Sequence, residues 1–227
     1  FDLRQGKAGV AYITDSSDKG PNGIIVVDLD SGRSWRRLHD HPSTKADRGF
    51  LPIVEGRPLM QRKPGQPPQH MAIGSDGIAI SHDGKYLYYC PLSSRRLYRV
   101  STEALRDEKR GEAEVGKTVE DLGDRGFASD GLESDDKGRI YLTDYEHNGI
   151  LRRGADGQYE TLVHDPRALW PDTLSLAADG YLYFTANQLH RQKQFHEGKD
   201  QRQTPYALFR VRVDAGPVLL RRGKERR

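Results

Sequence analysis

The 227-residue sequence has one cysteine, Cys90, and no apolar run near the roughly 20 residues that a membrane-spanning helix needs. A single cysteine excludes an internal disulfide, so cysteine usage indicates no cellular compartment, and we expect Cys90 to pack in the core. The first residues also lack the basic and apolar regions of a secretory signal peptide. We therefore expect no membrane partner for this chain.

The sequence also lacks a large excess of positive or negative charge. The 36 Lys and Arg residues nearly balance the 33 Asp and Glu residues, and the two signs are mixed along the chain. A nucleic-acid surface needs a concentrated basic patch, so we expect no nucleic-acid partner. The sequence contains no nucleophile elbow, phosphate-binding loop, dinucleotide fingerprint or zinc-protease helix. Serine-nucleophile and nucleotide chemistry therefore have no support.

The sequence does contain a repeated phrase. An aspartate opens a short apolar strand, a turn with Asp or Gly follows, and a tyrosine-containing strand comes next, at residues 75–88, 129–141 and 171–183. The leading aspartates, Asp76, Asp130 and Asp172, are separated by close to the roughly 40–50 residues of one propeller blade. Each blade is a four-stranded antiparallel sheet whose innermost strand lines a central channel. The repeat predicts an all-β fold of the β-propeller class.

The repeat divides residues 1–220 into four predicted blades, at 1–38, 75–122, 129–163 and 171–220, with a long connection at 39–74 and a basic tail at 221–227. The first blade retains only residues 1–3 of its inner strand, so we expect a partial propeller whose preceding blades lie outside this chain. The predicted strands are 10–15, 23–28, 34–38, 77–81, 86–90, 96–100, 117–122, 131–134, 139–143, 149–153, 159–163, 172–176, 181–185, 207–213 and 217–220. Residues 101–110 are predicted to be helical, after a serine cap.

Equivalent positions on radially arranged blades converge, so Asp76, Asp130 and Asp172 are expected to meet near one mouth of the channel. Buried carboxylates repel one another, and a cation normally accompanies such a cluster. A Ca²⁺ ion with oxygen ligands, or an ammonium group on a ligand, would suit. In the alternative interpretation, each aspartate caps a turn by accepting backbone N–H bonds. Trp170 lies two residues before Asp172. Its side chain either stacks on an organic cation or packs in the core.

Several segments together resemble the major royal jelly protein/Yellow family, whose bacterial members are often described as dopachrome-tautomerase-related. The resemblance is carried by residues 11–15, 23–29, 33–36, 77–81, 87–94, 170–172 and 187–189. It implies a six-bladed propeller of which this chain holds the last four blades, with the N-terminal blades missing. It also implies export from the cell, to a secreted or periplasmic location, and it adds Asn187 to the candidate ligand-binding residues.

Propellers of this family are similar in turn to the gluconolactonase/regucalcin family, which binds a divalent metal. By position, Asp76 and Asp130 match two of that family's metal-binding segments, and Asp130 would then also be a possible catalytic base. Asp76 stands where the family has asparagine, and the family's glutamate ligand would lie upstream of Phe1.

Two hypotheses therefore follow. The first is a propeller that binds a small molecule, such as an amine, or a cation at the channel mouth through Asp76, Asp130, Asp172, Trp170 and Asn187. The second is an enzyme, either a metal-dependent lactone hydrolase or a dopachrome-type tautomerase.

Overall fold

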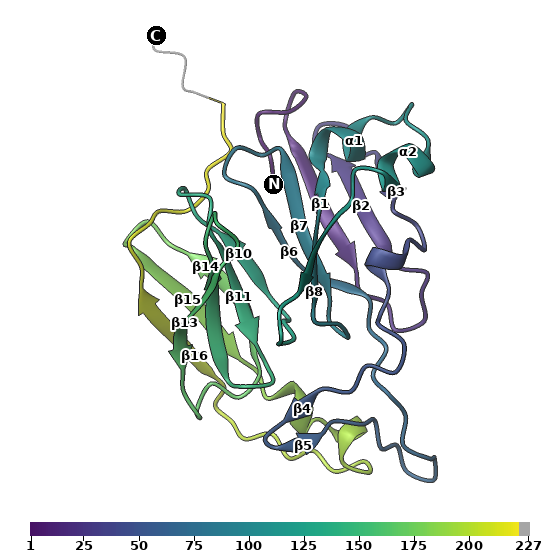
Figure 1. The fold of residues 1–227 in the computed structure, drawn as a ribbon, viewed down its shortest axis with the longest axis vertical. Coiled ribbons are helices and arrows are strands. Elements are labelled where there is room, and N and C mark those ends of the chain that lie inside the picture. The colour runs from purple at the N-terminus through teal and green to yellow at the C-terminus, as the bar shows by residue number, and fades with distance from the viewer. Residues whose placement is uncertain (223–227) are drawn as a thin grey trace.

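A computed structural model describes residues 1–222, which form four antiparallel sheets of three or four strands, one two-stranded hairpin and short helices (Figure 1). The first sheet has β1 (Val10–Asp15), β2 (Gly23–Asp28) and β3 (Ser34–Arg37). The second has β6 (Ser75–Ile80), β7 (Tyr86–Pro91), β8 (Arg96–Ser101) and β9 (Glu120–Asp124). The third has β10 (Leu132–Ser134), β11 (Ile140–Asp144), β12 (Gly149–Arg153) and β13 (Tyr159–His164). The fourth has β14 (Pro171–Leu176), β15 (Tyr181–Ala186) and β16 (Ala207–Arg212).

Each sheet is a meander in which neighbouring strands follow one another along the chain. The turns between the first two strands of the second and fourth sheets use Asp83-Gly84 and Asp179-Gly180. Gly84 and Gly180 adopt φ of +75° and +80°, which a residue without Cβ reaches at no steric cost. The predicted all-β, propeller-like fold is confirmed at this level.

The sheets pack face to face, and the core lies between them. One apolar cluster joins the first two sheets through side chains such as Ile24 and Leu87. A second joins the next pair through Leu97 and Ile140, and it contains Cys90, which is fully buried as predicted. A third cluster, which contains Phe184, lies between the third and fourth sheets. The strands β7 and β11 are covered on both faces, so they are buried along nearly their whole length and most of their residues are apolar.

Two segments cover one end of the sheets. The connection at 39–74 contains η1 (Pro42–Thr44) and a hairpin of β4 (Ile53–Val54) and β5 (Arg57–Pro58). The segment at 187–205 contains η2 (Leu189–Arg191) and η3 (Lys193–Phe195). In Figure 1 the β4–β5 hairpin lies beside the yellow-green chain of the second segment, and backbone hydrogen bonds join the two at Arg62.

Three predicted elements differ from the structure by more than two residues. The predicted helix at 101–110 is shorter, because α1 (Thr102–Arg106) ends before Asp107, although the Ser101 side chain caps it by accepting from Ala104 N–H at 3.2 Å. The strand predicted at 117–122 begins later, as β9, because α2 (Glu112–Gly116) occupies the chain before it.

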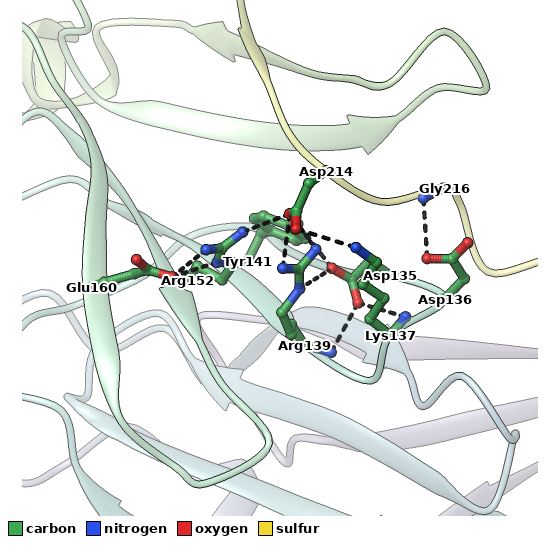
Figure 2. Close-up of polar contacts among 9 residues, drawn as sticks. All are labelled: Asp135, Asp136, Lys137, Arg139, Tyr141, Arg152, Glu160, Asp214 and Gly216. Carbon is green, nitrogen blue, oxygen red and sulfur yellow. Dashed lines mark hydrogen bonds and ion pairs between the residues drawn. The ribbon is translucent and has the colours of Figure 1, made fainter.

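The third difference concerns residues 217–220, which were predicted to form the fourth strand of the last blade. The structure has no such strand, and Pro217 makes a single bridge to Asp135 of the third sheet instead. Asp214 draws the chain across that sheet, because it pairs with Lys137 at 3.1 Å, Arg139 at 2.8 Å and Arg152 at 3.1 Å (Figure 2). The predicted tail at 221–227 lies mostly outside the described residues.

The inner strands approach one another closely where they begin. A Cβ added to Gly77 would lie 2.5 Å from the carbonyl oxygen of Asp130, and one added to Gly131 would lie 2.0 Å from that of Asp172. Both distances are too short for any side chain, and both neighbours are backbone atoms. The glycines after Asp76 and Asp130 are therefore packing requirements between blades.

We predict that Gly131→Ala lowers the free energy of unfolding by about 1–3 kcal/mol, because the added methyl group forces the inner strands apart. Urea-induced unfolding measures the change. Gly111→Ala is the matched control, since a Cβ there meets no atom within 4 Å. Equal stability of the two variants would contradict the close approach.

Candidate functional site

The structure brings the three repeated aspartates to one end of the inner strands. Asp76 and Asp172 are each the second residue of their strand, β6 and β14, and Asp130 lies two residues before β10. The strand pairing of β6 and of β14 is irregular at these aspartates, between Ser75 and Ile78 and between Pro171 and Leu174. The turn-cap interpretation does not account for the cluster, because among the hydrogen bonds of residues 1–222 none of these carboxylates accepts from a backbone N–H.

The three carboxyl groups are close enough to influence one another's ionisation. Burial raises the pKa of Asp76 to about 6, and the negative charge of Asp172 adds to the increase. Burial raises the pKa of Asp130 well above its ordinary value, with further increases from Asp172 and Asp76. Within the described part of the chain, no Arg or Lys is among the groups that change these pKa values. The cluster is therefore a concentration of acid with no cation of its own.

Asp172 has hydrogen-bond donors that favour its ionised form. Burial raises its pKa, but hydrogen bonds from the Thr173 hydroxyl and the Asn187 amide oppose that increase. The amide nitrogen of Asn187 donates to Asp172 Oδ2 at 2.5 Å, while its oxygen accepts the N–H of Leu189 at 2.9 Å. Asn187 therefore orients Asp172 directly.

Trp170 is part of the core, and it positions Asp130. Its indole N–H donates to Asp130 Oδ2 at 2.7 Å, and its side chain is fully buried. Tyr145 stacks on the indole with ring centroids 4.0 Å apart, and His190 stacks with centroids 5.9 Å apart. With aromatic neighbours on its rings and no exposed surface, Trp170 influences a ligand through Asp130 and does not stack on it.

The sequence interpretation missed the threonines that hold the aspartate segments. The Thr143 hydroxyl accepts the N–H groups of Asp130 and Gly131, at 2.9 and 3.0 Å. Thr185 accepts the N–H of Thr173 at 3.3 Å, and the Thr14 hydroxyl donates to the Asp76 carbonyl at 2.6 Å. These threonines occupy the same position in the second strand of their repeats. A threonine that recurs there after an apolar residue was the sequence pattern that could have identified them.

Glu133 was also missed. It lies on β10, three residues after Asp130. Its carboxylate accepts the N–H of Ser134 at 2.8 Å and that of Leu176 at 3.4 Å. Burial raises its pKa. The sequence signal was a charged residue within a short inner strand that is otherwise small or apolar.

The residues do not form a complete metal site. Within residues 1–222, no group of three or more His, Cys, Asp or Glu side chains is arranged to hold a metal ion. Asp76 and Asp130 supply the oxygen atoms that Ca²⁺ prefers, but Ca²⁺ takes six to eight such ligands. A divalent ion at these two residues stays a prediction.

The sequence profile described as major royal jelly protein matches residues 1–217. The chain belongs to the major royal jelly protein family. None of the curated proteins matches it significantly. In the described part of the chain, no helix has the length and apolar character to cross a membrane.

Solved structures with a similar fold are propeller proteins of low sequence identity. A luciferin-regenerating enzyme aligns over 89% of this chain with a TM-score of 0.51 and 14% identity. Virginiamycin B lyase from Staphylococcus aureus aligns over 80%, with a TM-score of 0.48 and 18% identity. A gluconolactonase from Xanthomonas campestris aligns over 78%, with a TM-score of 0.46 and 20% identity. The chain spans 57%, 47% and 56% of these three proteins, respectively.

We predict that Asp76→Asn makes the fold more stable at neutral pH. A pKa of about 6 in the folded chain lies above the ordinary value of 3.8, so the folded state holds this proton more tightly than the unfolded state. Stability from this group is present at low pH and is lost as the pH rises from about 4 through about 6. Because the side chain is only partly buried, we expect a gain of about 1–2 kcal/mol near pH 7.5.

Urea unfolding at several pH values measures this difference, and the two proteins should converge near pH 4, which is about the ordinary pKa of the group. The control is Asp18→Asn, at an exposed aspartate. An Asp76→Asn variant that is less stable at neutral pH would contradict the predicted repulsion.

Proposed function

We propose that this member of the major royal jelly protein family binds a small organic cation at the mouth of its central channel. The observation that carries the proposal is the convergence of Asp76, Asp130 and Asp172 without any Lys or Arg among the groups that affect their ionisation. An ammonium group would relieve the repulsion and form charge-assisted hydrogen bonds with the ionised members.

The individual carboxyl groups take different parts in this binding. Asp76 has a pKa of about 6, and its carboxylate accepts no hydrogen bond among the described residues, so it is available to pair with a cation near neutral pH. Asp172 would join it, because hydrogen bonds from Asn187 and Thr173 favour its ionised form. Asp130 is nearly fully buried, and this burial raises its pKa well above the ordinary value and so favours the protonated form, while the Trp170 indole N–H donates to Asp130 Oδ2. The ligand would therefore pair with Asp76 and Asp172 in preference to Asp130.

The enzyme hypothesis has one observation in its favour. A carboxyl group with a strongly raised pKa in a buried site is typical of proton-transfer residues, and Asp130 is such a group. The same burial works against Asp130 as a base, since a base must be ionised. A lactone hydrolase or tautomerase of this family therefore needs a cation that restores the charge on Asp130. Turnover of a lactone panel that requires added Ca²⁺ and is lost in Asp130→Asn would support the enzyme hypothesis.

We further propose that the four sheets are part of a six-bladed propeller whose remaining blades precede Phe1, and that the protein is exported, as the family suggests. Asp2 forms an isolated antiparallel bridge with Val10, the first residue of β1, with backbone hydrogen bonds in both directions at 2.9 and 3.0 Å. The first and last sheets also leave Ile13 and Leu208 exposed, at 48% and 67%, where further blades would pack.

We predict that phenethylamine binds the chain saturably and that Asp76→Asn and Asp172→Asn each weaken it about 10-fold, since each removes a partly buried charge. Isothermal titration calorimetry measures the affinity, with phenethyl alcohol as the uncharged ligand of the same body and Asp18→Asn as the protein control. The affinity should fall as the pH is lowered through about 6, the pKa of Asp76.

Equal affinity for the amine and the alcohol would refute the proposal. Displacement of the amine by CaCl₂ would instead identify the cation as divalent and would support the metal-binding form of the same site.

A further inference from the structure

A second cavity, of about 840 Å³, lies between the two segments that cover the end of the sheets. Its walls come from the β4–β5 hairpin and the chain after it, and from residues 190–201 of the other segment. None of the three clustered aspartates lines it. The volume falls within the roughly 300–1,000 Å³ typical of small-molecule sites.

The cavity is held open by fixed contacts between its walls. Arg62 N–H donates to the Gln194 carbonyl at 2.7 Å, and Glu197 N–H donates to the Arg62 carbonyl at 2.9 Å. Glu55 forms the hairpin turn in a left-handed conformation, with φ of +50°, and from there its carboxylate contacts His190 Nε2 at 2.8 Å and pairs with Arg191 at 2.6 Å. Residues in such strained conformations cluster at ligand-binding and active sites, and Glu55 joins two walls of this cavity.

His190, which lines the cavity, has a buried polar atom without a partner in the described part of the chain. Its side chain is only 5% exposed, and while Nε2 meets Glu55, Nδ1 is buried without a hydrogen-bond partner among residues 1–222. Native folds rarely leave a buried polar atom in this state, and the exceptions call for an explanation such as a bound group.

Both apolar and cationic side chains line the cavity. Val54, Leu59 and Phe195 are the buried apolar ones, at 4%, 9% and 4% exposure, and we call the exposed cationic side chains its rim. The rim carries Arg57, Arg62 and Lys199, and in the described part of the chain none of the three is within ion-pair distance of a carboxylate. Arg191 is neutralised by Glu55, so Glu197 is the remaining acid against three free cations.

We propose that this cavity binds an organic anion, a carboxylate with an apolar body, independently of the cation site at the aspartates. The apolar body would lie on Leu59 and Phe195, and the carboxylate would face Arg62 and Lys199. Because both cations are exposed, the carboxylate remains partly hydrated and its contribution depends on ionic strength.

The test is isothermal titration calorimetry of the 227-residue chain with phenylacetate at low salt. We expect saturable binding that is tighter than that of phenylacetamide, the neutral ligand of the same shape. The double substitution Arg62→Gln/Lys199→Gln should weaken phenylacetate about 5- to 10-fold, while Glu197→Gln should strengthen it about 2- to 3-fold. All three positions are exposed, so the variants should fold.

Lys109→Gln, an exposed lysine outside the cavity, is the matched control and should leave the affinity unchanged. Asp76→Asn and Asp172→Asn should also leave phenylacetate binding unchanged, which separates this inference from the proposed cation site. Equal binding of acid and amide, or an affinity that Arg62→Gln/Lys199→Gln does not alter, would overturn it. Loss of phenylacetate binding in the aspartate variants would place the ligand elsewhere and would overturn it as well.

Discussion

The candidate site depends on the close approach of the inner strands at the points where they begin. Gly77 and Gly131 lie so near the carbonyl oxygens of Asp130 and Asp172 that no side chain fits between the strands. The same approach forces the neighbouring carboxylates together, and burial then raises their pKa values. The apolar clusters between the sheets, each containing fully buried side chains, supply the free energy that offsets this repulsion.

Trp170 links the two candidate sites. Its indole N–H holds Asp130, and its ring stacks on His190, whose Nε2 meets Glu55 at the wall of the second cavity. Trp170 itself has φ of +58°, a conformation that a bulky residue adopts only where its surroundings enforce it. One buried indole therefore contacts a residue of each candidate site, and the opposite charges of the two sites are the reason we propose ligands of opposite charge for them.

Much of the fold could be predicted because short-range signals agree with one another. Alternating apolar residues and Asp-Gly turns fixed the strands of the second and third sheets to within a few residues, and the serine cap marked the start of α1. The predicted strand at 217–220 was wrong because the chain before it contacts the third sheet instead: Asp214 pairs with Lys137 and Arg139 of the β10–β11 turn and with Arg152 of β12, as Figure 2 shows, and Pro217 bridges to Asp135. The second cavity was not predicted either, since its walls are two segments more than a hundred residues apart that resemble ordinary loops.

The sequence by itself determined the repeat, and with it the strands, the turns, the family and the aspartates that share one repeat position. These follow from local conformational preference and from period, which a linear sequence displays. Only the tertiary structure decided which residues those aspartates contact: Trp170 is a buried donor to Asp130, and Asn187 orients Asp172. It also decided that Glu55 of one insertion contacts His190 of the other. The physical reason is that burial and electrostatic interaction depend on distance in space, and the chain folds distant residues to within a few ångströms of one another.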